Sequence, residues 1–173
     1  MRALPTQLLA AGLLSACTHS SGATVWQVSP LAQIADREGT VVAVASARDL
    51  AGVTVGVVAQ GMPAGTYAVH VHSVGRCDPP GYESAGPHWN PTSRQHGRLN
   101  PLGHHLGDLP NLTVDAEGNG SVEFAIAGGS LRGITNALLD ADGASVVIHA
   151  NADDERTDPS GNSGARIACG VLG

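Results

Sequence analysis

Five short valine-rich runs, each flanked by turn-forming residues, are the feature that most constrains the fold. They are GTVVAVASA (39–47), VTVGVVAQ (53–60), TYAVHVHS (66–73), SVEFAIAG (121–128) and ASVVIHA (144–150). No window shows a sustained 3.6-residue apolar period, and 23 glycines in 173 residues disfavour helices. Short strands at this spacing predict a single all-β domain, an antiparallel sandwich or barrel.

The composition suits a core of small and β-branched side chains. Apolar residues make up 42% of the chain, but aromatic residues contribute only 3%. The segments DAEGNGS (115–121) and GMPAGT (61–66) are typical of hairpin turns. The formal net charge is −6, and all nine basic residues are arginines, which argues against a nucleic-acid partner because such partners favour a basic face.

The start of the chain is typical of an export signal. A short apolar run, too short to span a bilayer, ends in small residues. The stretch LSAC, ending at Cys17, resembles the bacterial lipobox, in which the cysteine becomes the lipidated first residue. We expect a lipoprotein signal peptide over 1–16, with an ordinary signal cleaved nearby as the alternative. Residues 17–37 are then a tether leading into a first strand or a poorly ordered edge, and the domain spans 38–173.

Two further cysteines remain if Cys17 carries lipid. An exported protein can keep Cys77 and Cys169 as a disulfide, with two unpaired buried thiols as the alternative. The bridge would close a loop of roughly ninety residues, which the chain-entropy model values at about 4–5 kcal/mol.

A long connection from Ser73 to Leu112 interrupts the strands. It has no strand or helix pattern of its own, yet it holds four of the eight histidines. Loops of this length in a compact domain are usually functional. A bound metal would hold such a loop in place of an apolar core.

The histidines of the strands are spaced as metal ligands. His70 and His72 alternate along a strand and therefore project from the same face, although two polar residues facing solvent would follow the same pattern. His149 ends another apolar run, where a lone histidine can equally be structural.

The long loop adds a second set of candidate ligands. His88, His96 and His105 are followed by Asp108, and three imidazoles with one carboxylate complete a tetrahedral zinc set. Imidazoles suit copper as well. Spacing alone therefore predicts a transition-metal site, the alternative being a solvated loop.

An ordered set of motifs resembles the copper–zinc superoxide dismutase family. The resemblance covers roughly residues 39–173 and rests on HVH (70–72), GRC (75–77), AGPHWNP (85–91), HG (96–97), HLGD (105–108), His149 and GNSGARIACG (161–170). It implies a flattened antiparallel Greek-key β-barrel with long metal-binding loops.

The resemblance also implies two metal ions per subunit, one copper and one zinc. Copper would be held by His70, His72, His88 and His149. Zinc would be held by His88, His96, His105 and Asp108, so that His88 bridges the two metals.

Three further positions take their expected roles from the resemblance. Asp153 would accept hydrogen bonds from one copper ligand and one zinc ligand. Arg166 would stand beside copper and attract the anionic substrate. Cys77–Cys169 would be the family's intramolecular disulfide.

Some positions leave choices open. His104 adjoins His105, and only the spacing and the following Leu-Gly-Asp select His105 as the ligand. The segment after Asp154 is short and carries Arg156 where animal members are rich in lysine. Whether Arg156 assists in steering the substrate is therefore open.

The resemblance implies a superoxide dismutase, with His88 and Arg166 acting at the copper. The substrate would be superoxide, and contact with a membrane would be only through the N-terminal lipid, in the bacterial periplasm or cell envelope. The enzyme would protect that envelope as a monomer or a homodimer. A metal-storage protein and a copper-delivery protein are the alternatives, but storage gives no use for Arg166 and delivery usually needs an exchangeable thiol pair.

Overall fold

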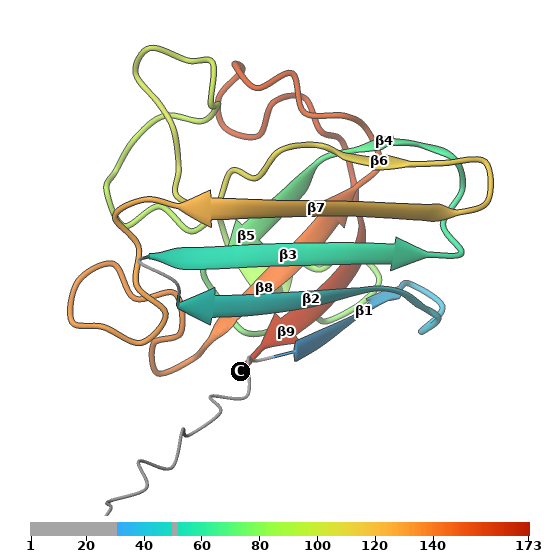
Figure 1. Cartoon of the computed structure of the whole chain (residues 1–173), viewed down its shortest axis with the longest axis horizontal. Coiled ribbons are helices and arrows are strands. Elements are labelled where there is room, and N and C mark those ends of the chain that lie inside the picture. Colours follow the sequence, from blue (N-terminus) through green and yellow to red (C-terminus); the bar gives the residue numbers. More distant parts are fainter. Residues whose placement is uncertain (1–30, 50–51) are drawn as a thin grey trace, which may run out of the picture.

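Nine antiparallel strands make up the framework of the protein (Figure 1). The computed structural model describes residues 31–49 and 52–173. The strands follow the order β4-β6-β7-β3-β2-β1-β9-β8-β5 in one sheet. Their bounds are β1 (Leu31–Asp36), β2 (Val41–Asp49), β3 (Val53–Gln60), β4 (Gly65–Tyr67), β5 (Val69–His72), β6 (Leu112–Val114), β7 (Asn119–Ile126), β8 (Ala144–His149) and β9 (Arg166–Leu172).

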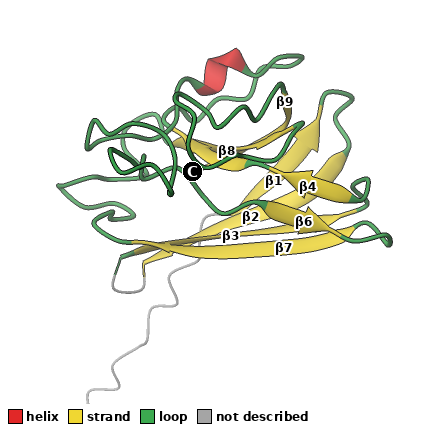
Figure 2. Ribbon diagram, turned by 90° about the horizontal axis from the view of Figure 1, so that it is seen from above, coloured by secondary structure: helices red, strands yellow, loops and turns green. Residues whose placement is uncertain are grey.

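The sheet curls until its two edges almost meet. β4 and β5 lie at opposite ends of the strand order, yet only Ala68 separates them in the chain. The backbone N–H of Ala68 donates to the Asn151 carbonyl at 2.8 Å, and its carbonyl accepts from His149 at 3.0 Å. The layer of β2, β3 and β7 therefore faces the layer of β5, β8 and β9 (Figures 1 and 2). The predicted flattened antiparallel barrel is confirmed.

The interior is built from small and branched side chains, as the composition predicts. Alternate residues of β2, namely Ala43, Ala45 and Ala47, are buried, while Val44 between them is exposed. Opposite them, Val146 and Ile148 and most other valines of the inner faces are fully buried.

All five predicted strands are present, but one of the predicted runs is divided into two strands. The run TYAVHVHS forms two strands, β4 and β5, because Ala68 between them makes its hydrogen bonds to the end of β8 and to Asn151 just after it. The segment 115–121 contains the β6–β7 hairpin turn and the start of β7, and the Asp115 carboxylate accepts backbone N–H groups of Glu117 and Asn119.

The prediction that GMPAGT (61–66) is a hairpin turn was wrong. β3 pairs with β2 on one side and β7 on the other, so neither edge is free for β4. β4 pairs with β6 instead. The segment is therefore a crossover connection, and the partners of a strand cannot be read from its turn alone.

β1 lies within the segment 17–37 that was predicted to be a tether leading into a first strand. It pairs with β2 and β9 in the interior of the strand order. Ala32 and Ile34 point into the core and Leu31 points out, the alternation of a half-buried strand. The barrel thus includes residues before the predicted boundary at 38. Residues 1–30, with the predicted signal peptide and Cys17, lie outside the described residues.

Two long connections lie beside each other on one side of the barrel (Figures 1 and 2). One joins β5 to β6 and contains the 3₁₀ helix η1 (Glu83–Ala85), and the other joins β8 to β9. Within the described ranges, no helix is long and apolar enough to cross a membrane.

Candidate metal centre

The two histidines of β5 are buried although they do not belong to the apolar core. His70 and His72 are both 0% exposed, because the β5–β6 loop covers the outer face of the strand. The loop is held there by main-chain pairing, in which Trp89 donates to the Val71 carbonyl at 2.8 Å and Val71 donates to the Gly107 carbonyl at 2.9 Å. The predicted projection of both imidazoles from one face is therefore observed.

His70, His72, His88 and His149 form a first cluster. A potential ligand atom of each lies within 4.8 Å of the others. The Nδ1 atoms of His72 and His149 face the carbonyls of Gly86 and Gly164 at 2.8 and 3.2 Å. A carbonyl only accepts, so these Nδ1 atoms carry the protons and the Nε2 atoms hold lone pairs.

Three nitrogens of the first cluster are buried without a hydrogen-bond partner. They are His70 Nδ1, His72 Nε2 and His149 Nε2. A buried polar atom left unpaired is costly, and such atoms in a protein call for an explanation. Three lone pairs converging in a space of a few ångströms are the donors that copper favours.

A second cluster gathers around one carboxylate oxygen. Nδ1 of His88, His96 and His105 lies 3.0, 3.0 and 3.1 Å from Asp108 Oδ1. Nδ1 of His88 and His105 are 3.2 Å apart. Zinc–ligand bonds of about 2.0–2.1 Å place tetrahedral ligands about 3.3 Å from one another. The spacing of these four atoms fits a zinc ion.

His70 also lies within ligand distance of His88, His96 and Asp108. Its Nε2 is already occupied by Asp153 at 2.9 Å, so one nitrogen remains and cannot serve both clusters. His105 contacts both His88 and Asp108 through Nδ1 and has no such conflict. The geometry therefore favours His105 as the fourth member of the second cluster.

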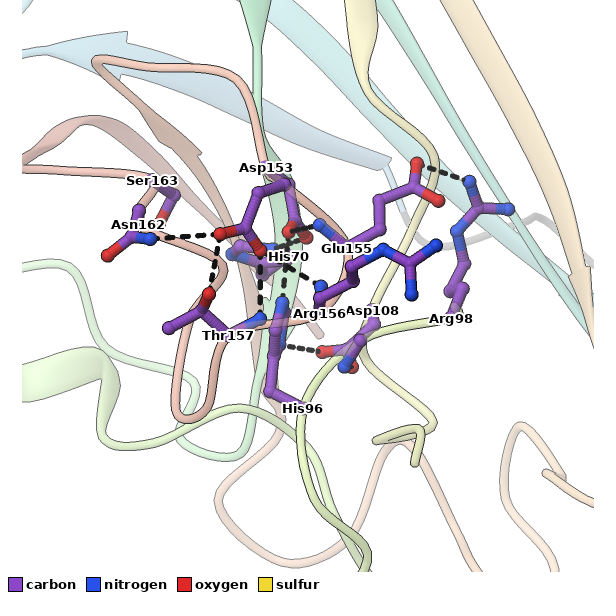
Figure 3. Close-up of polar contacts among 12 residues, drawn as sticks. His70, His96, Arg98, Asp108, Asp153, Glu155, Arg156, Thr157, Asn162 and Ser163 are labelled. Carbon is purple, nitrogen blue, oxygen red and sulfur yellow. Dashed lines mark hydrogen bonds and ion pairs between the residues drawn. The ribbon is translucent and has the colours of Figure 1, made fainter. Parts of the chain in front are cut away.

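Asp153 connects the two clusters (Figure 3). Its Oδ2 accepts from His70 Nε2 at 2.9 Å, and its Oδ1 accepts from His96 Nε2 at 3.0 Å. Since a carboxylate accepts, both Nε2 atoms carry protons, and Nδ1 is the nitrogen of each ring that faces its cluster.

Two residues that the sequence did not single out for this role hold Asp153 in place. Asn111 donates to the Asp153 carbonyl at 2.9 Å and accepts its backbone N–H at 2.8 Å. Gly161 has a φ of +64°, and a Cβ there would lie 1.7 Å from Asp153 Oδ1. Gly161 belongs to the GNSG motif, so the sequence marked the position although not its contact with Asp153. Nothing in the sequence near Asn111 indicated that it would bond Asp153.

Across the two clusters, most of the imidazoles with a shifted pKa are neutral, His96 is the exception, and the carboxylates are ionised. Burial lowers the pKa of His88 to about 4, and burial with the neighbouring His70 lowers the pKa of His149 to about 3. Burial opposes ionisation of Asp108, but hydrogen bonds from His105 and His88 hold its pKa far below the ordinary value. Burial likewise opposes the charge on His96, yet hydrogen bonds to Asp108 and Asp153 raise its pKa to about 9. At neutral pH most of the lone pairs are free and the carboxylates are negative, which suits cations.

Arg166 is fixed beside the first cluster. Its two terminal nitrogens donate to the carbonyls of Tyr82 and Gly86 at 2.7 and 2.8 Å. The Gly86 carbonyl also accepts from His72 Nδ1. Arg166, His88 and His149 line one cavity of about 900 Å³.

His104 and Arg156, the two positions that the sequence left open, lie outside the clusters and the cavity. His104 is half-buried, and its Nδ1 contacts the His105 carbonyl at 2.6 Å rather than the cluster. Arg156 is exposed, donates to the Leu99 carbonyl at 3.2 Å and does not line the cavity that Arg166 borders.

The disulfide Cys77–Cys169 is present and confirms that prediction. It links the β5–β6 loop to β9 across 92 residues of sequence, with the Cα atoms 5.7 Å apart. Tyr82 and Ala85 of the same loop pack with Cys169 and Val147. The loop segment that supplies the carbonyls for Arg166 is thereby attached to the barrel.

Comparison with known proteins agrees with this geometry. Residues 37–172 match the family model described as copper/zinc superoxide dismutase. The chain therefore belongs to the copper/zinc superoxide dismutase family, for which copper and zinc are the expected metals.

Relatives in several bacteria are similar to the chain. "Superoxide dismutase [Cu-Zn] 1" of Aquifex aeolicus is 45% identical over 64% of this chain and 66% of its own length. A "superoxide dismutase-like protein" of Bacillus subtilis is 48% identical over 64% of this chain and 57% of its own. These matches span less than two thirds of either relative.

A solved structure agrees in fold. The crystal structure of a SOD-like protein from Bacillus subtilis has a TM-score of 0.77 and 41% identity, covering 82% of this chain and 97% of that one. One similar protein is named a dismutase and another only dismutase-like.

The second cluster leads to a test with neighbouring residues. We expect His105→Ala to weaken Zn²⁺ binding by more than about 100-fold, because loss of a ligand exceeds the 10- to 100-fold effect of losing an outer partner. Competition with a chromogenic chelator measures the affinity. His104→Ala is the matched control and should bind Zn²⁺ as the unchanged protein does. Equal losses in both variants would contradict the assignment.

Proposed function

We propose that the protein is a copper–zinc superoxide dismutase. One superoxide is oxidised to dioxygen, and a second, with two protons, is reduced to hydrogen peroxide. The observation that carries the proposal is the set of three unpartnered imidazole nitrogens, one of which belongs to His149, a residue that lines the same cavity as Arg166. A redox site and an anion-binding group thus share one accessible space.

The two clusters would hold one copper and one zinc per chain. Copper would take His70, His72, His88 and His149, and zinc would take His88, His96, His105 and Asp108. When bound, copper supplies the one-electron redox chemistry that zinc lacks.

His88 belongs to both proposed ligand sets. Its Nδ1 lies among the atoms of the second cluster, so Nε2 is the nitrogen left for the first. His88 also borders the cavity. We assign to its Nε2 the role of holding a proton and releasing it to the departing peroxide while Nδ1 keeps the ring in place.

Arg166 would bind and orient the anion. Main-chain carbonyls accept one N–H from each terminal nitrogen, which leaves donors of the guanidinium for a substrate. Its anchoring by two carbonyls keeps the positive charge at a fixed position, and a guanidinium stays charged at any physiological pH.

Asp153 would act as a positioning residue for both metals. It orients one imidazole of each ligand set through its two oxygens. Asp153→Asn should lower the affinity for both metals by about 10- to 100-fold, measured by competition with a chelator. An unchanged affinity would argue against the role.

The alternatives use fewer of these features. A storage protein has no use for an arginine fixed in the same cavity as His88 and His149. A delivery protein would need exchangeable thiols, whereas Cys77 and Cys169 form a disulfide. The dismutase accounts for both observations.

We further propose that the chain is exported and anchored in the bacterial envelope by lipid on Cys17, where it removes superoxide as a monomer or homodimer. The lipobox-like stretch before Cys17 supports this. Fatty-acid labelling of cells expressing the full chain tests it: label is expected in the protein and should be absent from Cys17→Ser. Label retained in that variant would contradict it.

The proposed activity is tested by stopped-flow decay of superoxide. The chain from residue 17, carrying Cys17→Ser and loaded with copper and zinc, should accelerate decay in a second-order reaction. His149→Ala removes one of the lone pairs and should lower the rate by at least 100-fold, because the redox metal would lose a ligand. Leu31→Ala, at a 66% exposed position on the barrel, serves as control. Full metal content without faster decay would favour a storage protein.

A further inference from the structure

The cavity beside the first cluster contains a second arginine. Arg94 and Arg166 are its basic lining residues, and Asp140 and Asp158 are its acidic ones. The charges of the lining therefore balance. Among the side chains of the lining, loss of Arg94 would leave a net negative charge, which would weaken the attraction that bound metals exert on an anion.

Arg94 is presented by a well-ordered turn. The Asn90 side chain accepts the backbone N–H of Arg94 at 3.0 Å and donates to its carbonyl at 2.8 Å. Ser93, between them, has a φ of +52°, which tightens the turn. The turn begins two residues after His88, so the arginine is tied closely to the cluster. Arg94 lines both the main cavity and a smaller one of about 410 Å³.

The charge of Arg94 is not neutralised by a neighbour. Three other arginines form ion pairs with carboxylates, namely Arg48 with Glu123, Arg76 with Asp78 and Arg98 with Glu155. No carboxylate of the described residues lies within 4.0 Å of the Arg94 guanidinium. By contrast, the Asp158 carboxylate in the lining accepts the His96 backbone N–H at 2.6 Å.

We propose that Arg94 is the residue that steers superoxide into the cavity, a role the sequence had left open for Arg156. The inference rests on the proposed function. Charges at the rim of a site act mainly on the rate of encounter and on its salt dependence. Because the whole chain is acidic, with a formal net charge of −6, the anion depends on local positive charge. At an ionic strength of about 0.1 M, a field reaches about 10 Å, so a cation in the cavity wall counts while distant arginines are screened.

The test compares rate constants for superoxide decay across ionic strength. Arg94→Gln should lower the rate about 3-fold and Arg94→Glu about 10-fold at low salt, and both should approach the unchanged enzyme at high salt. Arg94→Lys should keep the rate. Arg156→Gln is the matched control, with the same change of charge outside the cavity, and should leave the rate and its salt dependence unaltered.

A second readout does not depend on turnover. Binding of azide, a small anion of the same charge, is followed through the absorption spectrum of the Cu²⁺-loaded protein. Its apparent Kd should rise about 3-fold in Arg94→Gln and more in Arg94→Glu, with metal content and melting temperature unchanged.

The outcomes separate the two proposals. If the unchanged protein dismutates superoxide and the Arg94 variants match Arg156→Gln at low salt, the steering role is overturned. If the unchanged protein does not dismutate superoxide, the proposed function fails. The azide comparison then still decides whether Arg94 draws anions into the cavity.

Discussion

The arrangement of both clusters depends on the hydrogen bonds that the Asp153 carboxylate accepts from His70 and His96. It accepts one hydrogen bond from Nε2 of His70 on β5 and another from Nε2 of His96 in the loop. A single side chain thus orients one imidazole in each cluster. Asn111 fixes its backbone on one side, and Gly161 leaves the space it occupies on the other. A residue that belongs to neither proposed ligand set thus determines which nitrogens are available to metals.

The barrel and the loops contribute differently to the site. Strands β5 and β8 supply His70, His72 and His149 from a rigid sheet. The long β5–β6 loop supplies the other members, and its own regular structure is limited to η1. The disulfide and main-chain bonds tie parts of this loop to the barrel, but the second cluster has no apolar core of its own. A bound cation would therefore contribute to the order of the loop as well as to chemistry.

Much of the fold follows from local sequence pattern. Valine alternation located the core strands, and Asp115 with its glycines marked a true hairpin. Pairing across the sheet did not follow: GMPAGT resembles a hairpin turn but crosses over, because both edges of β3 are occupied. β1 alternates as a strand should, yet its place beside β9 depends on contacts more than a hundred residues away. Similarly, the order of the histidine motifs along the chain was visible in the sequence. The contacts of Asn111 and Arg94 arise only when the loops pack together.

The central claim is that two metal sites share His88, and anomalous diffraction from crystals loaded with copper and zinc tests it most directly. Data on either side of the copper and zinc absorption edges should place copper beside His70 Nδ1, His72 Nε2 and His149 Nε2. They should place zinc beside Asp108 Oδ1, with the His88 ring between the two ions. Both ions in one cluster, or a His88 ring that contacts only one of them, would contradict the account.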